Sequence, residues 1–173
     1  MVAITTADKR AELPGTVSGV IRLKPQQFIH ILDNNTGVTR LELGPQTITL
    51  QDHERLVLDP TPTLIIPPQY YCIVKNPVLR DEAGEPLVDR YGQIRLRYGD
   101  REIRLSQDPF PLYPGEDLDL DVTPLQVVET NQALRLRAIR DFTDGEVARA
   151  AGDERLFEGP GTCIPRVQVA VVA

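Results

Sequence analysis

Three aspartates at alternate positions, Asp117, Asp119 and Asp121, form the pattern in this sequence that comes nearest to a metal-binding motif. They match the first three ligands of an EF-hand calcium loop. That loop also needs a glycine at its sixth position and a carboxylate at its twelfth, where this sequence has Val122 and Val128. Apolar residues alternate with the aspartates, which is typical of a strand with an acidic outer face. We therefore expect weak attraction of divalent ions at most, and no metal or other cofactor.

Residues that could act as nucleophiles or bind phosphate do not fall into a catalytic motif. The two histidines, His30 and His53, lie in an apolar stretch and in a polar turn, and no GxSxG elbow supplies a serine for them to activate. The sequence has no GxxxxGK[ST] loop, and the proline within Gly159-Pro160-Gly161 removes an amide donor that a phosphate cradle would need. We expect that the protein is not an enzyme.

Arginine density is the strongest remaining chemical signal. Four arginines cluster between residues 95 and 104, and three more follow between residues 135 and 140. An RNA-binding surface would interleave aromatic residues for base stacking, and only Tyr91 and Tyr98 stand near the first cluster. The net charge of -6 also disfavours a protein that binds by neutralising phosphates. The arginines favour a solvated or inter-chain salt-bridging face, with a protein-binding surface as the alternative.

The elements that position these side chains are predicted to be strands. Apolar and polar residues alternate along much of the chain, no long segment shows helical periodicity between caps, and 15 prolines interrupt the sequence. No apolar run is long enough to span a membrane, and residues 1–18 lack the apolar core of a signal peptide. We expect residues 1–18 to form a mobile tail. Cys72 and Cys163 are expected to be reduced thiols, since they form no CxxC pair.

The alternation locates individual strands. It predicts strands at residues 20–23, 28–32, 38–43, 47–50, 55–58, 63–66, 69–74, 117–122, 123–128, 130–136 and 167–171. It also predicts that residues 94–98 and 101–105 form a hairpin around Gly99-Asp100.

These strands recur in three copies, each broken by a glycine–proline or proline–glycine turn. The turns are Gly44-Pro45, Pro114-Gly115 and Gly159-Pro160. Residues 156–162 repeat the pattern of residues 42–47, and residues 69–74 align with residues 27–32. Copies spaced by roughly 45 to 65 residues indicate an array of small sheets. The predicted fold is all-β, a tandem array of three small antiparallel β-sheet repeats at residues 19–62, 63–122 and 123–173.

The proline-rich stretch at residues 106–116 is neither helix nor central strand, because proline fixes φ and lacks a backbone donor. In the repeat alignment it becomes the enlarged turn region of the middle copy. Its apolar residues Phe110, Leu112 and Tyr113 are expected to pack beneath the next repeat. The stretch would then hold successive repeats in register.

Six motifs in these copies resemble a known family, the N-terminal vault repeats of major vault proteins. The motifs are residues 28–33, 51–55, 71–78, 103–116, 121–128 and 152–162. The resemblance implies that the chain is the first three repeats of a much longer subunit, many copies of which stand side by side as staves of a hollow, barrel-shaped ribonucleoprotein. It places the N-terminal end at the waist, where two half-shells meet.

The resemblance also implies partners and a location. The partners are the protein itself in many copies and a vault poly(ADP-ribose) polymerase, whereas the small RNAs of the particle are not expected to bind this segment. No membrane is expected. The location is expected to be cytoplasmic, with a minor nuclear fraction. The alternative function is a monomeric β-repeat module that docks a regulatory partner such as the polymerase.

Assembly is expected to use charged residues that alternate onto a polar face. We predict Arg40 and Glu42, the pair Arg95 and Arg97, and the pair Arg101 and Arg104 as lateral or waist contacts. A repeated heterologous contact of this kind closes into a ring.

Overall fold

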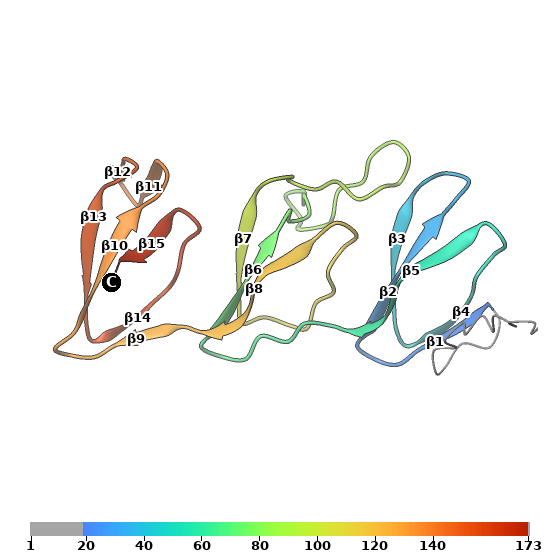
Figure 1. Cartoon of the computed structure of the whole chain (residues 1–173), viewed down its shortest axis with the longest axis horizontal. Coiled ribbons are helices and arrows are strands. Elements are labelled where there is room, and N and C mark those ends of the chain that lie inside the picture. The colour runs from blue at the N-terminus through green and yellow to red at the C-terminus, as the bar shows by residue number, and fades with distance from the viewer. Residues whose placement is uncertain (1–18, 173) are drawn as a thin grey trace, which may run out of the picture. The chain divides into compact units, whose positions relative to one another are not determined.

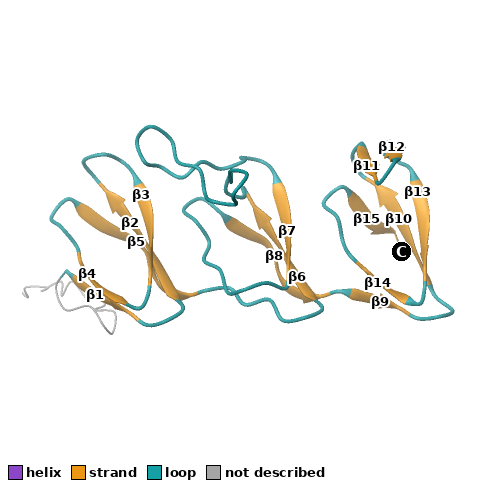
Figure 2. Ribbon diagram, turned by 180° about the vertical axis from the view of Figure 1, so that it is seen from behind, coloured by secondary structure: helices purple, strands orange, loops and turns teal. Residues whose placement is uncertain are grey.

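The computed structural model describes residues 19–172, and these residues form strands and turns without any helix (Figures 1 and 2). The predicted all-β array of small antiparallel sheets is confirmed. No helix in the described range could cross a bilayer. The predicted tail, residues 1–18, lies outside the described residues. The chain divides into two compact units, one up to Pro62 and one from Thr63 onward.

The first unit contains one three-stranded sheet and one two-stranded ribbon. The sheet has the order β3-β2-β5, from β2 (Gln27–Asp33), β3 (Thr39–Leu43) and β5 (Glu54–Pro62). The ribbon pairs β1 (Val20–Leu23) with β4 (Gln46–Thr49). Between them lies a core of aliphatic side chains, Ile21, Leu23, Ile29 and Ile31, flanked by Ile48, Leu50 and Leu56. Burial of this apolar surface stabilises the unit.

The second unit contains two sheets of the same design. In the middle repeat, β6 (Tyr70–Lys75) lies between β7 (Arg101–Leu105) and β8 (Asp117–Pro124). The counterpart of the ribbon is a single bridge between Leu64 and Phe110, so the strand predicted at residues 63–66 does not form.

The third repeat adds a small hairpin to the shared design. Its sheet places β10 (Ala133–Ala138) between β13 (Glu154–Glu158) and β15 (Val169–Val172). Its ribbon pairs β9 (Gln126–Val128) with β14 (Gly161–Cys163). The hairpin pairs β11 (Phe142–Asp144) with β12 (Val147–Arg149).

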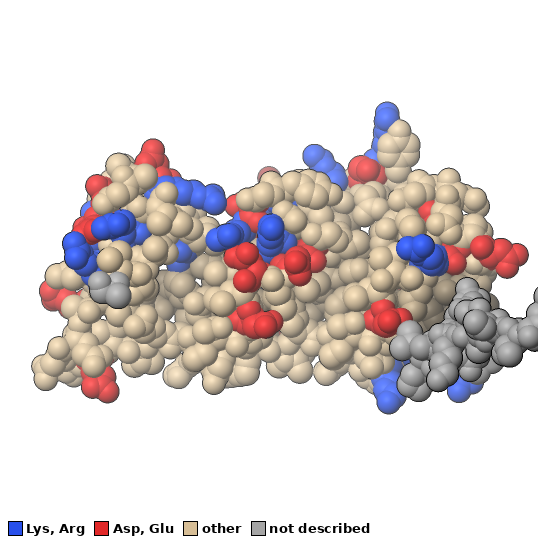
Figure 3. Space-filling view, viewed as in Figure 1, with Lys and Arg blue, Asp and Glu red and all other residues tan. Residues whose placement is uncertain are grey.

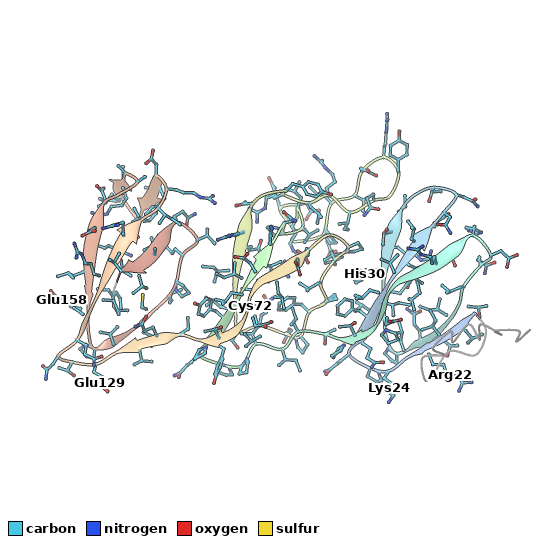
Figure 4. All side chains as sticks on the ribbon, viewed as in Figure 1. Arg22, Lys24, His30, Cys72, Glu129 and Glu158 are labelled. Atoms are coloured by element: carbon cyan, nitrogen blue, oxygen red, sulfur yellow. The ribbon has the colours of Figure 1, made fainter. Side chains whose placement is uncertain are left out.

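The glycine–proline turns of the first and third repeats are equivalent atom for atom. The Gly44 amide donates to the Gln27 carbonyl, and the Gly159 amide donates to the Gln132 carbonyl. A Cβ at either glycine would stand 2.0 Å from a backbone oxygen, that of Lys24 or that of Glu129. Figure 4 marks Lys24 and Glu129 at the bend that precedes the central strand of each sheet. Glycine is required at both turns because the two chain segments touch there.

The predicted alignment of residues 69–74 with residues 27–32 is wrong by one position. That alignment matches Pro68 with Gln26, but it is Gln69 that shares the left-handed conformation of Gln26, with φ of 64° and 59°. Tyr70 pairs with Pro124 as Gln27 pairs with Pro62, so Cys72 corresponds to Ile29. Because side chains alternate between the faces of a sheet, this shift moves each residue to the opposite face.

The predicted hairpin of residues 94–98 with residues 101–105 is also wrong. Strand β7 pairs with β6, whereas Leu96 bridges Val78 and Ile94 bridges Val88. Residues 76–100 therefore form a separate loop of short bridges, which we call the arm. Two aspartates, Asp81 and Asp89, each accept two backbone amides in its turns. Such Asx turns fix the backbone locally without a longer ladder.

The proline-rich stretch packs differently from the prediction. Phe110 and Leu112 contact Ile66, Cys72 and Val74 within the core of their own repeat. They do not lie beneath the next one. Gly115 has a φ of 94° in the turn that brings the Glu116 amide to the Tyr113 carbonyl. The stretch thus supplies the second wall of the middle core, the place that β4 and the following loop occupy in the first unit.

Candidate assembly surface

Arg40 and Glu42 form an ion cluster at the rim of the first core. The Arg40 guanidinium donates to Glu42 at 2.9 Å and to Glu54 at 2.5 Å. Alternation of apolar and polar residues predicted that Arg40 and Glu42 lie on the polar face of the sheet. They instead pair with Ile31 and Ile29 and so share the core-facing side of the sheet. The hydrogen bond from Arg40 lowers the pKa of Glu54, and the bond from Glu54 raises the pKa of Arg40.

A chain of alternating charges crosses the middle repeat. Arg97 contacts Glu102 at 2.8 Å, Glu102 contacts Arg104 at 3.0 Å, and Arg104 contacts Glu116 at 2.7 Å. The Arg104 side chain is only 6% exposed, and that of Glu116 is 0% exposed. The prediction that Arg104 lies on an exposed contact face is therefore wrong.

The Glu116 carboxylate connects three segments of the middle repeat. Its Oε1 accepts the Val78 amide at the base of the arm, and its Oε2 accepts the Tyr113 amide in the proline-rich stretch. Arg104 lies over the Phe110 ring at 4.8 Å. Buried charges are tolerated when they are paired and hydrogen-bonded in this way.

The remaining predicted arginines lie at the surface. Arg101 reaches Asp119 at 3.2 Å across the sheet. Arg95 is exposed in the arm. Figure 3 shows acidic and basic groups interspersed over the middle repeat, without a field of one sign. Such a surface selects a complementary partner more than it adds stability.

Sequence reasoning missed the carboxylates that organise these arginines. Glu54 and Glu116 occupy the same place in their repeats, where each closes a turn by accepting the amide three residues before it, at Gln51 or Tyr113. A glutamate directly after a turn, at the start of β5 and just before β8, was the signal. In the third repeat Glu154 accepts hydrogen bonds from both Arg135 and Arg137. These bonds lower the pKa of Glu154, and the bond from Arg137 has the larger effect. That pairing joins strands β10 and β13, so alternation within one strand could not reveal it.

Each three-stranded sheet ends in two edge strands, and most of these edges expose a large apolar side chain. Edge strands present unpaired backbone donors and acceptors that invite pairing with another chain. The exposed side chains are Leu43 on β3, Val57 on β5, Leu105 on β7, Leu156 on β13 and Val171 on β15. Apolar side chains next to unpaired backbone, beside charged residues, are the composition of a protein–protein contact.

The described residues offer little for chemistry of another kind. No group of three or more His, Cys, Asp or Glu side chains within residues 19–172 could hold a metal ion. Both cysteines are free and buried, and burial raises the pKa of the Cys72 thiol. Figure 4 shows Cys72 within the sheet of the middle repeat.

Comparison with known proteins gives a consistent result. Two family models, each described as a major vault protein repeat domain, match residues 63–122 and residues 126–166. The chain is 59% identical over 155 residues to major vault protein alpha of Dictyostelium discoideum, which covers 90% of this chain and 18% of that protein. It is 57% identical over 153 residues to the major vault protein of Diplobatis ommata, with 88% and 18% covered.

A mammalian relative shows the same match. The chain is 54% identical over 158 residues to the major vault protein of Mus musculus, covering 91% of this chain and 18% of the relative. The chain thus spans about a fifth of the length of these relatives. The β repeats, the equivalent turns and the sequence identity agree: this chain belongs to the major vault protein family.

Proposed function

We propose that the chain is a segment of a structural subunit that associates side by side with other copies of itself, as staves of a vault shell. The observation that carries the proposal is that the edge strands of each sheet expose apolar side chains, such as Leu43 in the first unit and Val171 in the second. Family membership supports it, since the relatives are named as major vault proteins. Self-association would bury these edges and complete their backbone hydrogen bonds.

The charged residues predicted as contacts form the second part of this proposal. Arg40, Glu42, Arg95, Arg97 and Arg101 retain exposed or half-exposed side chains that a neighbouring copy or the second half-shell could contact. Arg104 acts only inside its own repeat, since Glu116 and Phe110 enclose it. The waist position of the first repeat, the cytoplasmic location and a poly(ADP-ribose) polymerase as partner belong to the same proposal.

A chimera tests the proposal. The matched segment of the Dictyostelium discoideum protein is replaced by this chain, and the product is imaged by electron microscopy beside the unaltered relative. Closed shells are expected from both. A second chimera carries Leu105→Lys and Leu156→Lys on two edges and should give fewer or no shells, because the lysines place unpaired charges in an apolar contact. Tyr98→Lys, in the 80% exposed arm position, is the matched control.

Two results would contradict the proposal. One is a folded, soluble chimera that stays monomeric where the relative forms shells. The other is full assembly of the Leu105→Lys and Leu156→Lys chimera. A monomeric chimera that still binds a partner through the arm would favour the docking-module alternative.

A further inference from the structure

The third repeat contains a pocket whose lining is mostly apolar. Its volume is about 430 Å³, within the range of small-molecule sites. It opens between the sheet of the third repeat and the strand that enters from the middle repeat, Thr123–Gln126, with Tyr71 on the same side. These elements all belong to the second compact unit.

The equivalence of the repeats explains why this pocket exists. The registers of the ribbons place Gln126 where the first repeat has Ile21, and Cys163 where it has Ile48. The next turn is closed in the first repeat by the Glu54 amide, which donates to the Gln51 carbonyl, and in the third by the Val169 amide, which donates to the Arg166 carbonyl. Aligning these two turns places Pro165 where the first repeat has Leu50.

The middle repeat fills the same space with large side chains. It has Leu64 and Phe110 at the two ribbon positions and Leu112 in the turn. At these positions the third repeat therefore has smaller or more polar side chains, and its core is left unfilled. A well-packed core leaves few voids larger than a water molecule, so these three side chains account for the open space between the sheet and the ribbon of the third repeat.

Two arginines give the pocket a charge. Arg155 and Arg166 both line it, and both pair with a single carboxylate, Asp144, at 2.5 Å and 3.1 Å. Two guanidinium groups against one carboxylate leave one positive charge in excess. Their side chains are 36% and 44% exposed, so they can reach a bound molecule without leaving solvent. Arginine presents a fork of donors that matches a carboxylate or phosphate.

We propose that this pocket binds an amphiphilic anion, such as a medium-chain carboxylate. Its aliphatic chain would lie among Leu136, Cys163 and Val171 in the space that Ile48 and Leu50 fill in the first repeat. Its anionic head would sit at Arg155 and Arg166, in place of a second carboxylate beside Asp144. All residues of the pocket lie within one chain, and the pocket shares only Val171 with the exposed edges proposed for shell assembly.

The first experiment measures selectivity among ligands of equal chain length. Decanoate, decanol and decyltrimethylammonium are titrated onto the 173-residue chain by calorimetry. Decanoate should bind about tenfold or more tightly than decanol, because its carboxylate adds one charged hydrogen bond. Decyltrimethylammonium should not bind. Equal binding of decanoate and decanol would overturn the assignment of the head group.

Variants separate the chain site from the head site. Cys163→Phe introduces the residue that the middle repeat has at this position, and should abolish binding of both ligands while leaving the fold intact or more stable. The double variant Arg155→Gln with Arg166→Gln should still bind decanol, and the ratio of decanoate affinity to decanol affinity should fall to about one. Arg135→Gln, on the opposite face of β10, is the matched control and should bind as the parent does. Unchanged decanoate binding in Cys163→Phe would overturn the proposal.

The cysteine in the pocket provides a readout without variants. Cys163 lines the pocket, whereas Cys72 is fully enclosed in the middle core. Bound decanoate should slow alkylation of Cys163 by iodoacetamide, followed by peptide mass, with Cys72 as the internal reference. Sedimentation with and without decanoate completes the test. A dimer that decanoate dissociates would show that a second copy fills the pocket, and would overturn the proposal.

Discussion

At the scale of single residues, two equivalent glutamates do the same work in different surroundings. Glu54 and Glu116 each close a turn through a backbone amide and each accept a hydrogen bond from an arginine on the opposite edge strand of the sheet. Glu116 is enclosed and also holds the base of the arm through Val78. The arginines come from different positions, Arg40 and Arg104, which are not equivalent in the registers of β3 and β7. The carboxylate, rather than the arginine, is the shared feature.

Removing the Glu116 carboxylate should strongly destabilise the second unit. Glu116→Ala removes the enclosed partner of Arg104, leaving only the half-exposed Glu102, and leaves two amides without an acceptor; it should cost about 3–5 kcal/mol in denaturant unfolding. Glu102→Gln, at the half-exposed neighbour of Arg104, should cost about 1 kcal/mol or less. Replacing both Arg104 and Glu116 by methionine should recover much of the loss. Equal costs for Glu116→Ala and Glu102→Gln would refute this role.

The lowered pKa of Glu54 predicts how the stability of the first unit responds to acid. Its pKa is lowered in the folded chain by Arg40 and the Gln51 amide, from an ordinary value of 4.5. A lowered pKa gives a stabilisation that is complete above the unfolded value and is lost as the pH falls through the folded value. The protection factors of the β2 amides, which correct for the slower intrinsic exchange in acid, should therefore fall below about pH 4.5 in the parent. Glu54→Gln should weaken that fall in protection, whereas Glu82→Gln, in an exposed arm turn, should preserve it.

At the scale of elements, the sequence predicted where many strands lie but not all of their pairing partners. Alternation located β2 and β8, and the repeated Gly-Pro dipeptide located the two equivalent turns. It failed for the arm, where Ile94 bridges Val88 and Leu96 bridges Val78. Alternation alone gives no reason to prefer these partners over β7. It also failed for residues 69–74, where matching glutamines by name hid the left-handed positions Gln26 and Gln69. Pairing partners and faces are tertiary properties, and a one-residue shift reverses them.

The equivalent glycine turns give a prediction for these elements. Gly44→Ala and Gly159→Ala each place a Cβ 2.0 Å from a backbone oxygen and should cost about 3 kcal/mol, the upper range for overpacking. Gly37→Ala meets no atom within 4 Å but has a φ of 74°, and should cost about 1 kcal/mol. Thermal unfolding of the three variants ranks them. Tolerance of alanine at Gly44 would contradict the close approach of the two segments.

At the scale of the whole molecule, the sequence predicted a repeat array and its family, and it could not predict the interior differences between repeats. The third core is open because three separate positions, Gln126, Cys163 and Pro165, are filled differently. Each substitution is unremarkable in sequence, and their proximity arises only from the fold. The burial of Arg104 has the same origin, since Glu116 lies twelve positions along the chain.

The most direct measurement of side-by-side association is disulfide cross-linking between opposite edges of one sheet. Leu43→Cys on β3 and Val57→Cys on β5 are introduced together into the chimeric subunit, which is oxidised after assembly. Strand β2 separates the two edges by about 10 Å within one chain, too far for an internal disulfide. Association through edges predicts a ladder of covalent multimers on a denaturing gel, and monomers from either single variant. Intact shells that yield only monomers from the double variant would contradict association through these edges.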